Sequence, residues 1–146
     1  MLASPGYSGT PLPKKLGLKP GQSVAFVNLP ADLELLASAE PFANVDRAAT
    51  AAELGPTDAH DVIHAFYVDE AHLAGALGCL RSAIKPDGAL WISWPKRAAK
   101  VATDITEDVI RRHALAGGLV DVKVCAVSEV WSGLKLVIPV AQRPPR

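Results

Sequence analysis

The stretch DVIHAFYVDEAHLAGALGCLRSAIKPDGALWISWPK, residues 61–96, decides the fold. Residues 61–68 are rich in apolar β-branched and aromatic side chains, as buried strands are. Apolar residues then recur at helical spacing across residues 69–84. A turn at residues 85–88 leads into a second apolar run at residues 89–94. This strand–helix–strand unit predicts a parallel sheet with a right-handed helical crossover.

The segment before this unit predicts shorter elements of the same kind. A short helix is expected over residues 12–16 and a buried strand over residues 23–28. Pro30 suits the first turn of a brief helix, and a short strand is expected over residues 42–48. Residues 49–60 form a connecting segment with one helical turn.

The segment after the unit predicts a helix and two strands. Residues 104–107 resemble a capping box that opens the helix, and Gly117-Gly118 ends it. Residues 119–128 and 131–140 are separated by a link short enough for antiparallel pairing. The predicted fold is therefore α/β, with three Rossmann-like layers and a mainly parallel sheet closed by an antiparallel C-terminal hairpin.

Length and composition favour one ordinary domain over residues 1–146, with an arm and short helix at 1–17 and a frayed tail at 142–146. The 49% share of hydrophobic residues is enough to build a core. Fifteen basic residues balance fifteen acidic ones, so no net field favours nucleic acid or an anionic membrane. No charged and apolar leader is present, and no apolar run approaches the roughly 18 residues of a membrane span. We therefore expect a cytoplasmic protein.

The cysteines and histidines predict no metal site. Cys79 and Cys125 lack metal or redox spacing, and we expect both to be reduced thiols that face the core. His60 and His64 would lie on one face of a strand about 13 Å apart, too far to share a zinc ion.

Residues 61–140, with the Lys85-Pro86-Asp87-Gly88 turn, resemble the C-terminal half of class I S-adenosylmethionine-dependent methyltransferases in their order of elements. A second resemblance spans nearly the whole chain. The runs at residues 6–12, 14–17, 94–96 and 131–135 are similar to those of a family of small, functionally uncharacterised bacterial proteins. That family implies a fold like a truncated class I methyltransferase and no assigned reaction.

The first strand is followed by Asn28-Leu29-Pro30-Ala31-Asp32, where a cofactor-binding fold would carry a glycine-rich loop. Leucine adds bulk there, and proline removes a backbone donor. Asp46 is the one acidic residue placed to hold ribose hydroxyls at the end of the next strand. S-adenosylmethionine is therefore not the favoured cofactor, although it stays an alternative.

Ligands of open α/β sheets bind at the carboxyl ends of the strands, where several segments of this chain should meet. An aromatic face beside an ammonium group, as in Trp94 and Lys96, would hold a planar or anionic ligand. Alternatively, Trp94 seals the sheet against the N-terminal arm. The candidate ligand-binding residues are Tyr7, Ser8, Thr10, Asn28, Phe66, Ser93, Trp94, Lys96 and Trp131.

No catalytic residue is assigned, because no nucleophile motif such as Gly-x-Ser-x-Gly occurs. The leading hypothesis is a non-catalytic methyltransferase-like domain that binds a small ligand or a protein partner. The enzymatic alternative is an atypical S-adenosylmethionine-dependent methyltransferase that holds its cofactor with residues 6–10, Asn28, Trp94 and Lys96. The third hypothesis is a self-associating structural module, a homo-oligomer that pairs through a terminal edge strand at residues 134–140.

Overall fold

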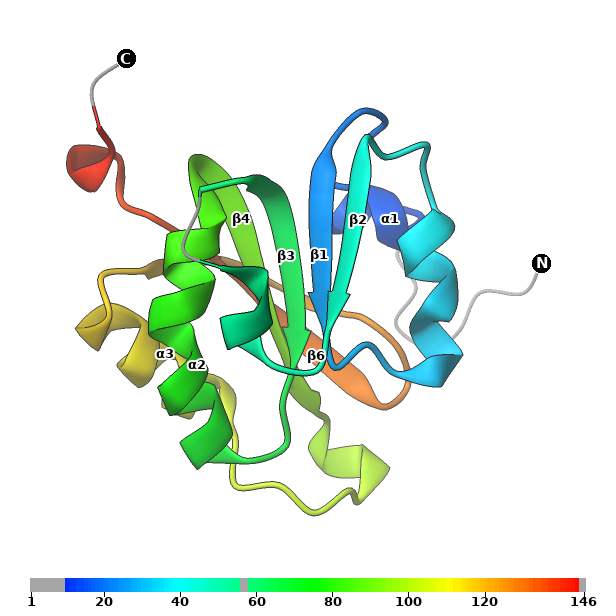
Figure 1. Cartoon of the computed structure of the whole chain (residues 1–146). Helices are drawn as coiled ribbons and strands as arrows, with labels where there is room; N and C mark the ends of the chain where they lie inside the picture. The colour runs from blue at the N-terminus through cyan, green and yellow to red at the C-terminus, as the bar shows by residue number, and fades with distance from the viewer. Residues whose placement is uncertain (1–9, 56–57, 145–146) are drawn as a thin grey trace.

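The computed structural model describes residues 10–55 and 58–144, which form a six-stranded sheet with helices on both faces (Figure 1). The strands are β1 (Ser23–Val27), β2 (Asn44–Ala48), β3 (His60–Phe66), β4 (Ile84–Pro95), β5 (Val120–Ala126) and β6 (Trp131–Val137). The α-helices are α1 (Leu12–Lys15), α2 (Glu70–Ala83) and α3 (Glu107–Ala116). Short 3₁₀ helices are η1 (Ala31–Ser38), η2 (Ala51–Leu54), η3 (Arg97–Ala99) and η4 (Val140–Gln142). None of the helices in these ranges is long and apolar enough to cross a bilayer.

The strand order is β2-β1-β3-β4-β6-β5. Strands β1 to β4 run parallel, and β6 lies antiparallel between β4 and β5. This confirms the predicted α/β fold with a mainly parallel sheet and an antiparallel C-terminal pair. The chain moves outward from β1 to β2 and then returns to the other side of β1, so the strand order reverses between β1 and β3. A crevice for ligands forms at such a point, beyond the carboxyl ends of the strands.

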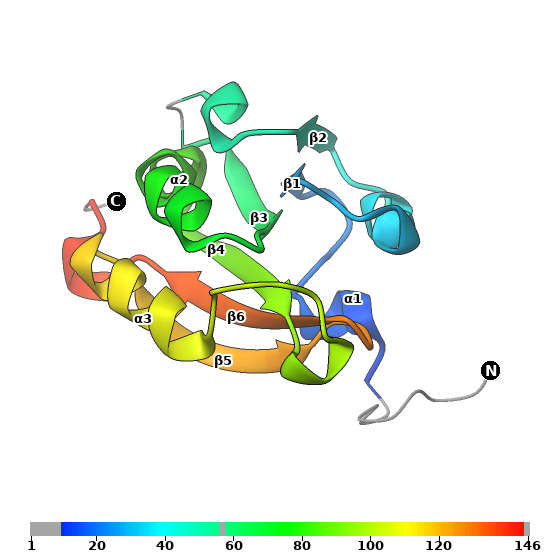
Figure 2. The same ribbon diagram turned by 90° about the horizontal axis from the view of Figure 1, so that it is seen from below.

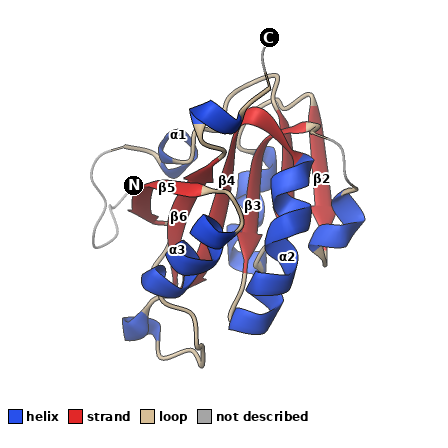
Figure 3. Cartoon of the chain, turned by 90° about the vertical axis from the view of Figure 1, so that its left-hand side faces the viewer, coloured by secondary structure: helices blue, strands red, loops and turns tan. Residues whose placement is uncertain are grey.

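Alternation of side chains along β3 divides the core into two layers. Val62 and Phe66 pack towards α1 and η1, whereas Ile63 and Ala65 pack towards α2 and α3. Figure 2 looks onto the carboxyl edge and shows α2 and α3 on one side of the sheet and α1 on the other. Figure 3 shows α2 and α3 in front of the strands. Three layers result because both faces of the central strands are apolar.

Trp91, and not Trp94, joins the sheet to the N-terminal segment. The indole Nε1 of Trp91 donates to the carbonyl oxygen of Leu16 at 3.0 Å, in the layer that contains α1. Trp94 is buried in the opposite layer, in the same apolar cluster as Ile105. Trp94 therefore lies on the face of β4 away from α1, and residues 1–9 of the arm that it was expected to meet lie outside the described residues.

Residues 85–88 form a bulge inside β4 and not the expected turn before it. Ile84 already pairs with His60, and Ala89 pairs with Val62. Between these two pairs β3 advances two residues and β4 advances five, so three extra residues of β4 loop out. The Lys-Pro-Asp-Gly composition is typical of a turn, but pairing on both sides keeps the segment within the strand.

Asp61 and Gly88 explain why the bulge fits against β3. The Asp61 carboxylate accepts from the Lys85 Nζ at 3.0 Å and from the backbone N–H of Ser23 at 2.9 Å. Gly88 lies against the chain of β3, so that a Cβ there would meet the carbonyl oxygens of His60 and Asp61 at 3.0 Å each. The ion pair between Lys85 and Asp61 thus holds the bulge in place, and glycine at position 88 lets it approach β3.

Two further expectations require correction. The predicted capping box at residues 104–107 is divided between two helices: Thr106 caps α3 by accepting from the Val109 N–H at 3.2 Å, whereas Asp104 accepts from the Glu70 N–H of α2 at 2.7 Å. Strand β6 is also interior, because β5 lies outside it. Residues 134–140 therefore cannot supply the edge for self-association, and the two edges of this sheet are β2 and β5.

The close approach at Gly88 predicts opposite effects of alanine at two glycines. We expect Gly88→Ala to lower the free energy of unfolding by about 1–3 kcal/mol through overpacking. Gly78→Ala should raise it by about 0.5–1 kcal/mol, because an added Cβ in α2 meets nothing within 4 Å. Urea denaturation measures both changes. A stabilising effect of Gly88→Ala would contradict the packing described for the bulge.

Candidate ligand-binding site

A cavity of about 640 Å³ lies at the carboxyl edge of the sheet, where the strand order reverses. Its walls come from the ends of β1 and β3, from the segment after β2, from α2 and from the first residue of β6. This volume is within the usual range for small-molecule sites.

Asn28 joins three parallel strands at the mouth of this cavity. Its backbone N–H donates to the Ala48 carbonyl at the end of β2, at 3.0 Å. Its side-chain Nδ2 donates to the Phe66 carbonyl at the end of β3, at 3.2 Å. Its backbone is left-handed, with φ of 57°, a conformation that asparagine tolerates better than most residues with a side chain. The chain thus makes with asparagine a turn that other folds of this type make with glycine.

The described residues that line the cavity include no Asp, Glu, Lys or Arg to hold a charged cofactor. Pro30 precedes η1 without a side-chain cap and has no N–H to offer a phosphate or carboxylate. Strand β2 ends in Ala48, followed by Ala49 and Thr50, and the Glu53 carboxylate beside them already accepts from the Thr50 N–H at 3.1 Å.

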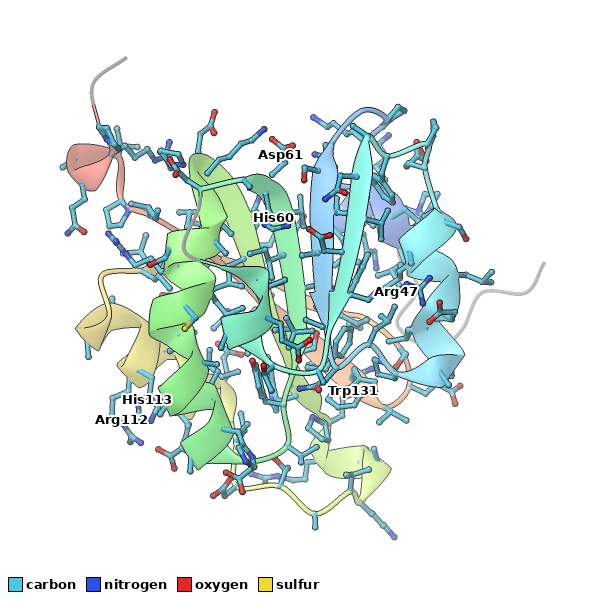
Figure 4. All side chains as sticks on the ribbon, in the orientation of Figure 1. Arg47, His60, Asp61, Arg112, His113 and Trp131 are labelled. Carbon is cyan, nitrogen blue, oxygen red and sulfur yellow. The ribbon has the colours of Figure 1, made fainter. Side chains whose placement is uncertain are left out.

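Asp46 does not occupy the ribose-binding position expected for it. Its carboxylate accepts from the Nε2 of buried His60 at 2.8 Å. Figure 4 shows His60 at the end of the sheet opposite to Trp131, so Asp46 serves the other edge. The hydrogen bond from His60 holds the pKa of Asp46 below its usual value.

Aromatic rings form one wall of the cavity. Phe66 and Trp131 meet edge to face, with ring centroids 5.2 Å apart. On the inner side of Phe66, His64 stacks at a centroid distance of 4.3 Å. Edge-to-face and offset contacts of this kind hold rings in fixed orientations. The half-buried Trp131 thus packs against Phe66 and forms a wall of the cavity.

Small residues form the opposite walls, on η2 and on one side of α2. Leu73, Leu77 and Leu80 of α2 point into the core, so the flank of the helix that faces η2 carries short side chains. The small residues that line the cavity from these two helices are Ala51, Ala52, Ala71, Gly75, Ala76 and Cys79. Cys79 is exposed. The expectation that Cys79 faces the core is wrong, because it lies beside the buried stripe of α2 and not within it.

Tyr67 carries a buried hydroxyl without a hydrogen-bond partner among the described residues. The residue lines the cavity and its side chain is 6% exposed. Burial, followed by the charge of Cys79, raises the pKa of Tyr67 to about 12, so the hydroxyl stays protonated. An unpaired buried hydroxyl costs free energy, and this one has essentially no accessible surface toward the cavity.

The structure brings three of the nine predicted site residues to the cavity: Asn28, Phe66 and Trp131. Ser93 is buried and bonded to His64, with 2.6 Å between Oγ and Nε2. Lys96 closes the end of β4 through its backbone N–H, which donates to the Val130 carbonyl at 2.7 Å. Thr10, Ser93, Trp94 and Lys96 are not among the residues that line the cavity, and Tyr7 and Ser8 lie outside the described residues.

Sequence reasoning did not select Thr50, Tyr67, Gly75 or Cys79. Tyr67 follows Phe66 at the end of a strand that the sequence already placed at this edge, so the sequence could have predicted that Tyr67 lies there. Gly75 lies inside α2, where glycine disfavours the helix and no turn requires it. Its presence there was a second signal in the sequence for a residue of the site. Within residues 10–55 and 58–144, no group of three or more His, Cys, Asp or Glu side chains is placed to hold a metal ion.

No protein-family model matches this chain, and no curated protein matches it in sequence. Solved structures do match its fold. The magnesium protoporphyrin IX methyltransferase from Synechocystis, solved with bound SAH, has a TM-score of 0.59 at 16% identity, over 82% of this chain and 75% of that one. The fold is that of the class I S-adenosylmethionine-dependent methyltransferases.

Two further structures agree with this assignment. A SAM-dependent methyltransferase from Aquifex aeolicus has a TM-score of 0.61 at 17% identity, over 86% of this chain and 87% of that one. A putative sarcosine dimethylglycine methyltransferase from Galdieria sulphuraria has a TM-score of 0.62 at 10% identity, over 86% and 83%. At these identities the likeness establishes a methyltransferase-like fold. The chemistry has to be inferred from the residues of the site.

The turn at Asn28 predicts an order among substitutions. Asn28→Gly and Asn28→Ala both lose the side-chain hydrogen bond to Phe66, but Asn28→Ala keeps a Cβ in the left-handed turn, whereas Asn28→Gly removes it. We expect the alanine variant to be less stable than the glycine variant by about 1 kcal/mol. Chemical denaturation measures the difference. Equal stabilities would show that the left-handed backbone does not constrain this position.

Buried His64 predicts a pH dependence of stability. Burial lowers its pKa to about 3 from the ordinary 6.5, so the native state holds the neutral ring. The unfolded state binds a proton as the pH falls below 6.5, and the stability present above that pH is lost progressively towards pH 3. The wild type should lose about 1.4 kcal/mol per pH unit more than His64→Gln, which does not titrate. Parallel stability profiles of the two proteins would show that His64 is not held neutral.

Proposed function

We propose that this methyltransferase-like domain binds a small ligand in the cavity at its carboxyl edge and does not transfer methyl groups. One observation carries the proposal: the cavity stands at the switch point between β1 and β3, while the described residues that line it include no Asp or Glu and no glycine-rich loop to hold a charged cofactor. Folds of this type are reused without their chemistry. The balanced charge of the chain supports a role independent of nucleic acid.

The enzymatic alternative is an atypical S-adenosylmethionine-dependent methyltransferase. It is favoured by the fold and by the position of the cavity, since SAH is bound in one of the similar structures. The two proposals differ in what the cavity binds.

A blocking variant separates these proposals. Gly75→Leu places a large side chain into the cavity, and Ala74→Leu is its control, because Ala74 is exposed on the same helix and does not line the cavity. We expect native mass spectrometry to recover a small molecule from a bacterial metabolite extract on the wild type and Ala74→Leu, and none on Gly75→Leu. Isothermal titration with S-adenosylmethionine and S-adenosylhomocysteine should give no heat.

A different result of the same experiments would support the enzymatic alternative. Micromolar binding of S-adenosylmethionine that is lost in Gly75→Leu and kept in Ala74→Leu would establish the enzymatic alternative. If no molecule is retained by any of the three folded proteins, the cavity is not a ligand site.

A further inference from the structure

We propose that the cavity at the carboxyl edge continues along α2 as one groove, and that this groove binds an extended, uncharged hydrocarbon chain. This inference rests on the proposed function and adds the chemical class and the shape of the ligand.

A second, smaller cavity of about 250 Å³ adjoins the first along α2. Both are bounded by η2, which packs against α2 (Figure 1). The two cavities share Ala52 and Cys79 as lining residues, so they meet at these side chains. On α2 the lining runs from Ala71 in the first cavity to Ser82 in the second, about 16 Å along the helix axis. A compact molecule fills one cavity, whereas an extended chain reaches through both.

The described residues that line the two cavities carry no formal charge. Neither set includes Asp, Glu, Lys or Arg. Among the polar groups, the Asn28 amide donates to the Phe66 carbonyl, and the Thr50 hydroxyl is bonded to Glu53. A charged group that leaves water for such a groove loses hydration without gaining a counter-charge. The groove therefore favours an uncharged segment of a ligand.

The outer side of α2 exposes small residues where a helix in water usually exposes charged ones. None of its exposed residues is Asp, Glu, Lys or Arg. These exposed residues are Ala71, His72, Ala74, Gly75, Gly78, Cys79 and Ser82. A hydrocarbon chain laid along this side would remove apolar area from water, which is favourable in proportion to the area removed.

Two glycines keep this side of α2 open. Gly75 lines the first cavity and Gly78 lines the second, and both lie inside the helix, where glycine is less favourable than alanine. An added Cβ at either position would meet nothing within 4 Å, so packing among the described residues does not require glycine there. Space is thus kept open in both cavities at a cost to the helix, as a ligand that spans both would require.

Cys79 provides the readout, because its thiol is exposed and lines both cavities. In a Cys125→Ser background it is the single thiol of the chain. The rate of its reaction with Ellman's reagent reports whether the groove is occupied. The probes 1-hexanol, 1-octanol and 1-decanol differ only in chain length. 1-Adamantanol contains as many carbon atoms as 1-decanol, but in a compact cage.

We expect the three linear alcohols to protect Cys79 in a saturable manner. The dissociation constant should fall about two- to fourfold for each added methylene, as half to full burial of that group predicts. 1-Adamantanol should bind more weakly than 1-decanol, because the cage fills only one of the two cavities.

Leucine at each glycine blocks a different part of the groove. Gly78→Leu should weaken 1-decanol by at least about fourfold, as the loss of two methylene contacts predicts, and leave 1-hexanol and 1-adamantanol unchanged. Gly75→Leu should abolish protection by all four alcohols, relative to its own unprotected rate. The control Ala74→Leu should keep it, because Ala74 is exposed on the same helix and lines neither cavity.

Three results would overturn the chain-binding groove and leave a ligand-binding cavity in place. They are an affinity that does not depend on chain length, 1-adamantanol binding as tightly as 1-decanol, and Gly78→Leu binding 1-decanol as the wild type does. Absence of protection by every alcohol, together with a retained metabolite that Gly75→Leu loses, would also overturn the ligand class alone. If neither alcohol nor metabolite binds, both the class and the proposed function fail.

Discussion

The carboxyl edge of this protein depends on two hydrogen bonds that Asn28 donates, one to Ala48 and one to Phe66, which we call the Asn28 clasp. One residue donates from its backbone to the end of β2 and from its side chain to the end of β3, while it turns the chain out of β1. Parallel strands leave polar groups at their ends, and these groups must be paired wherever water is excluded. Asn28 pairs two of them at the point where the strand order reverses. These hydrogen bonds hold the ends of β1, β2 and β3 close to one another, and the ends of these strands border the cavity.

The same clasp gives a physical account of a methyltransferase-like fold without the usual cofactor grip. A glycine loop keeps backbone N–H groups free for a ligand, whereas the Asn28 N–H already bonds Ala48 and Pro30 has no N–H at all. The edge is therefore stabilised from within the protein. What it offers to a ligand is apolar area and aromatic walls. The fold is shared with the methyltransferases.

The core layer that contains α1 and η1 holds polar groups that are paired deep inside the protein. His64 bonds Ser93, and Trp91 bonds the carbonyl of Leu16. The second contact joins β4 to a residue 75 positions earlier in the chain, so it holds the N-terminal segment against the sheet. The first leaves the His64 Nδ1 without a partner among the described residues. A buried ring with one free nitrogen stays neutral, which ties the stability of this layer to pH.

The sequence by itself determined the order and kind of the elements, the absence of a glycine loop and the place of Asn28, Phe66 and Trp131 at one edge. These features follow from rules that act over a few residues, such as side-chain alternation, helical spacing and the missing N–H of proline. The tertiary structure decided that residues 85–88 bulge within β4, that Asp104 caps α2, that Asp46 serves His60 and that Cys79 is exposed. Each of these depends on a partner brought near by strand order and helix packing. Local patterns do not encode such partners, because the same turn or carboxylate satisfies whichever backbone group the fold places beside it.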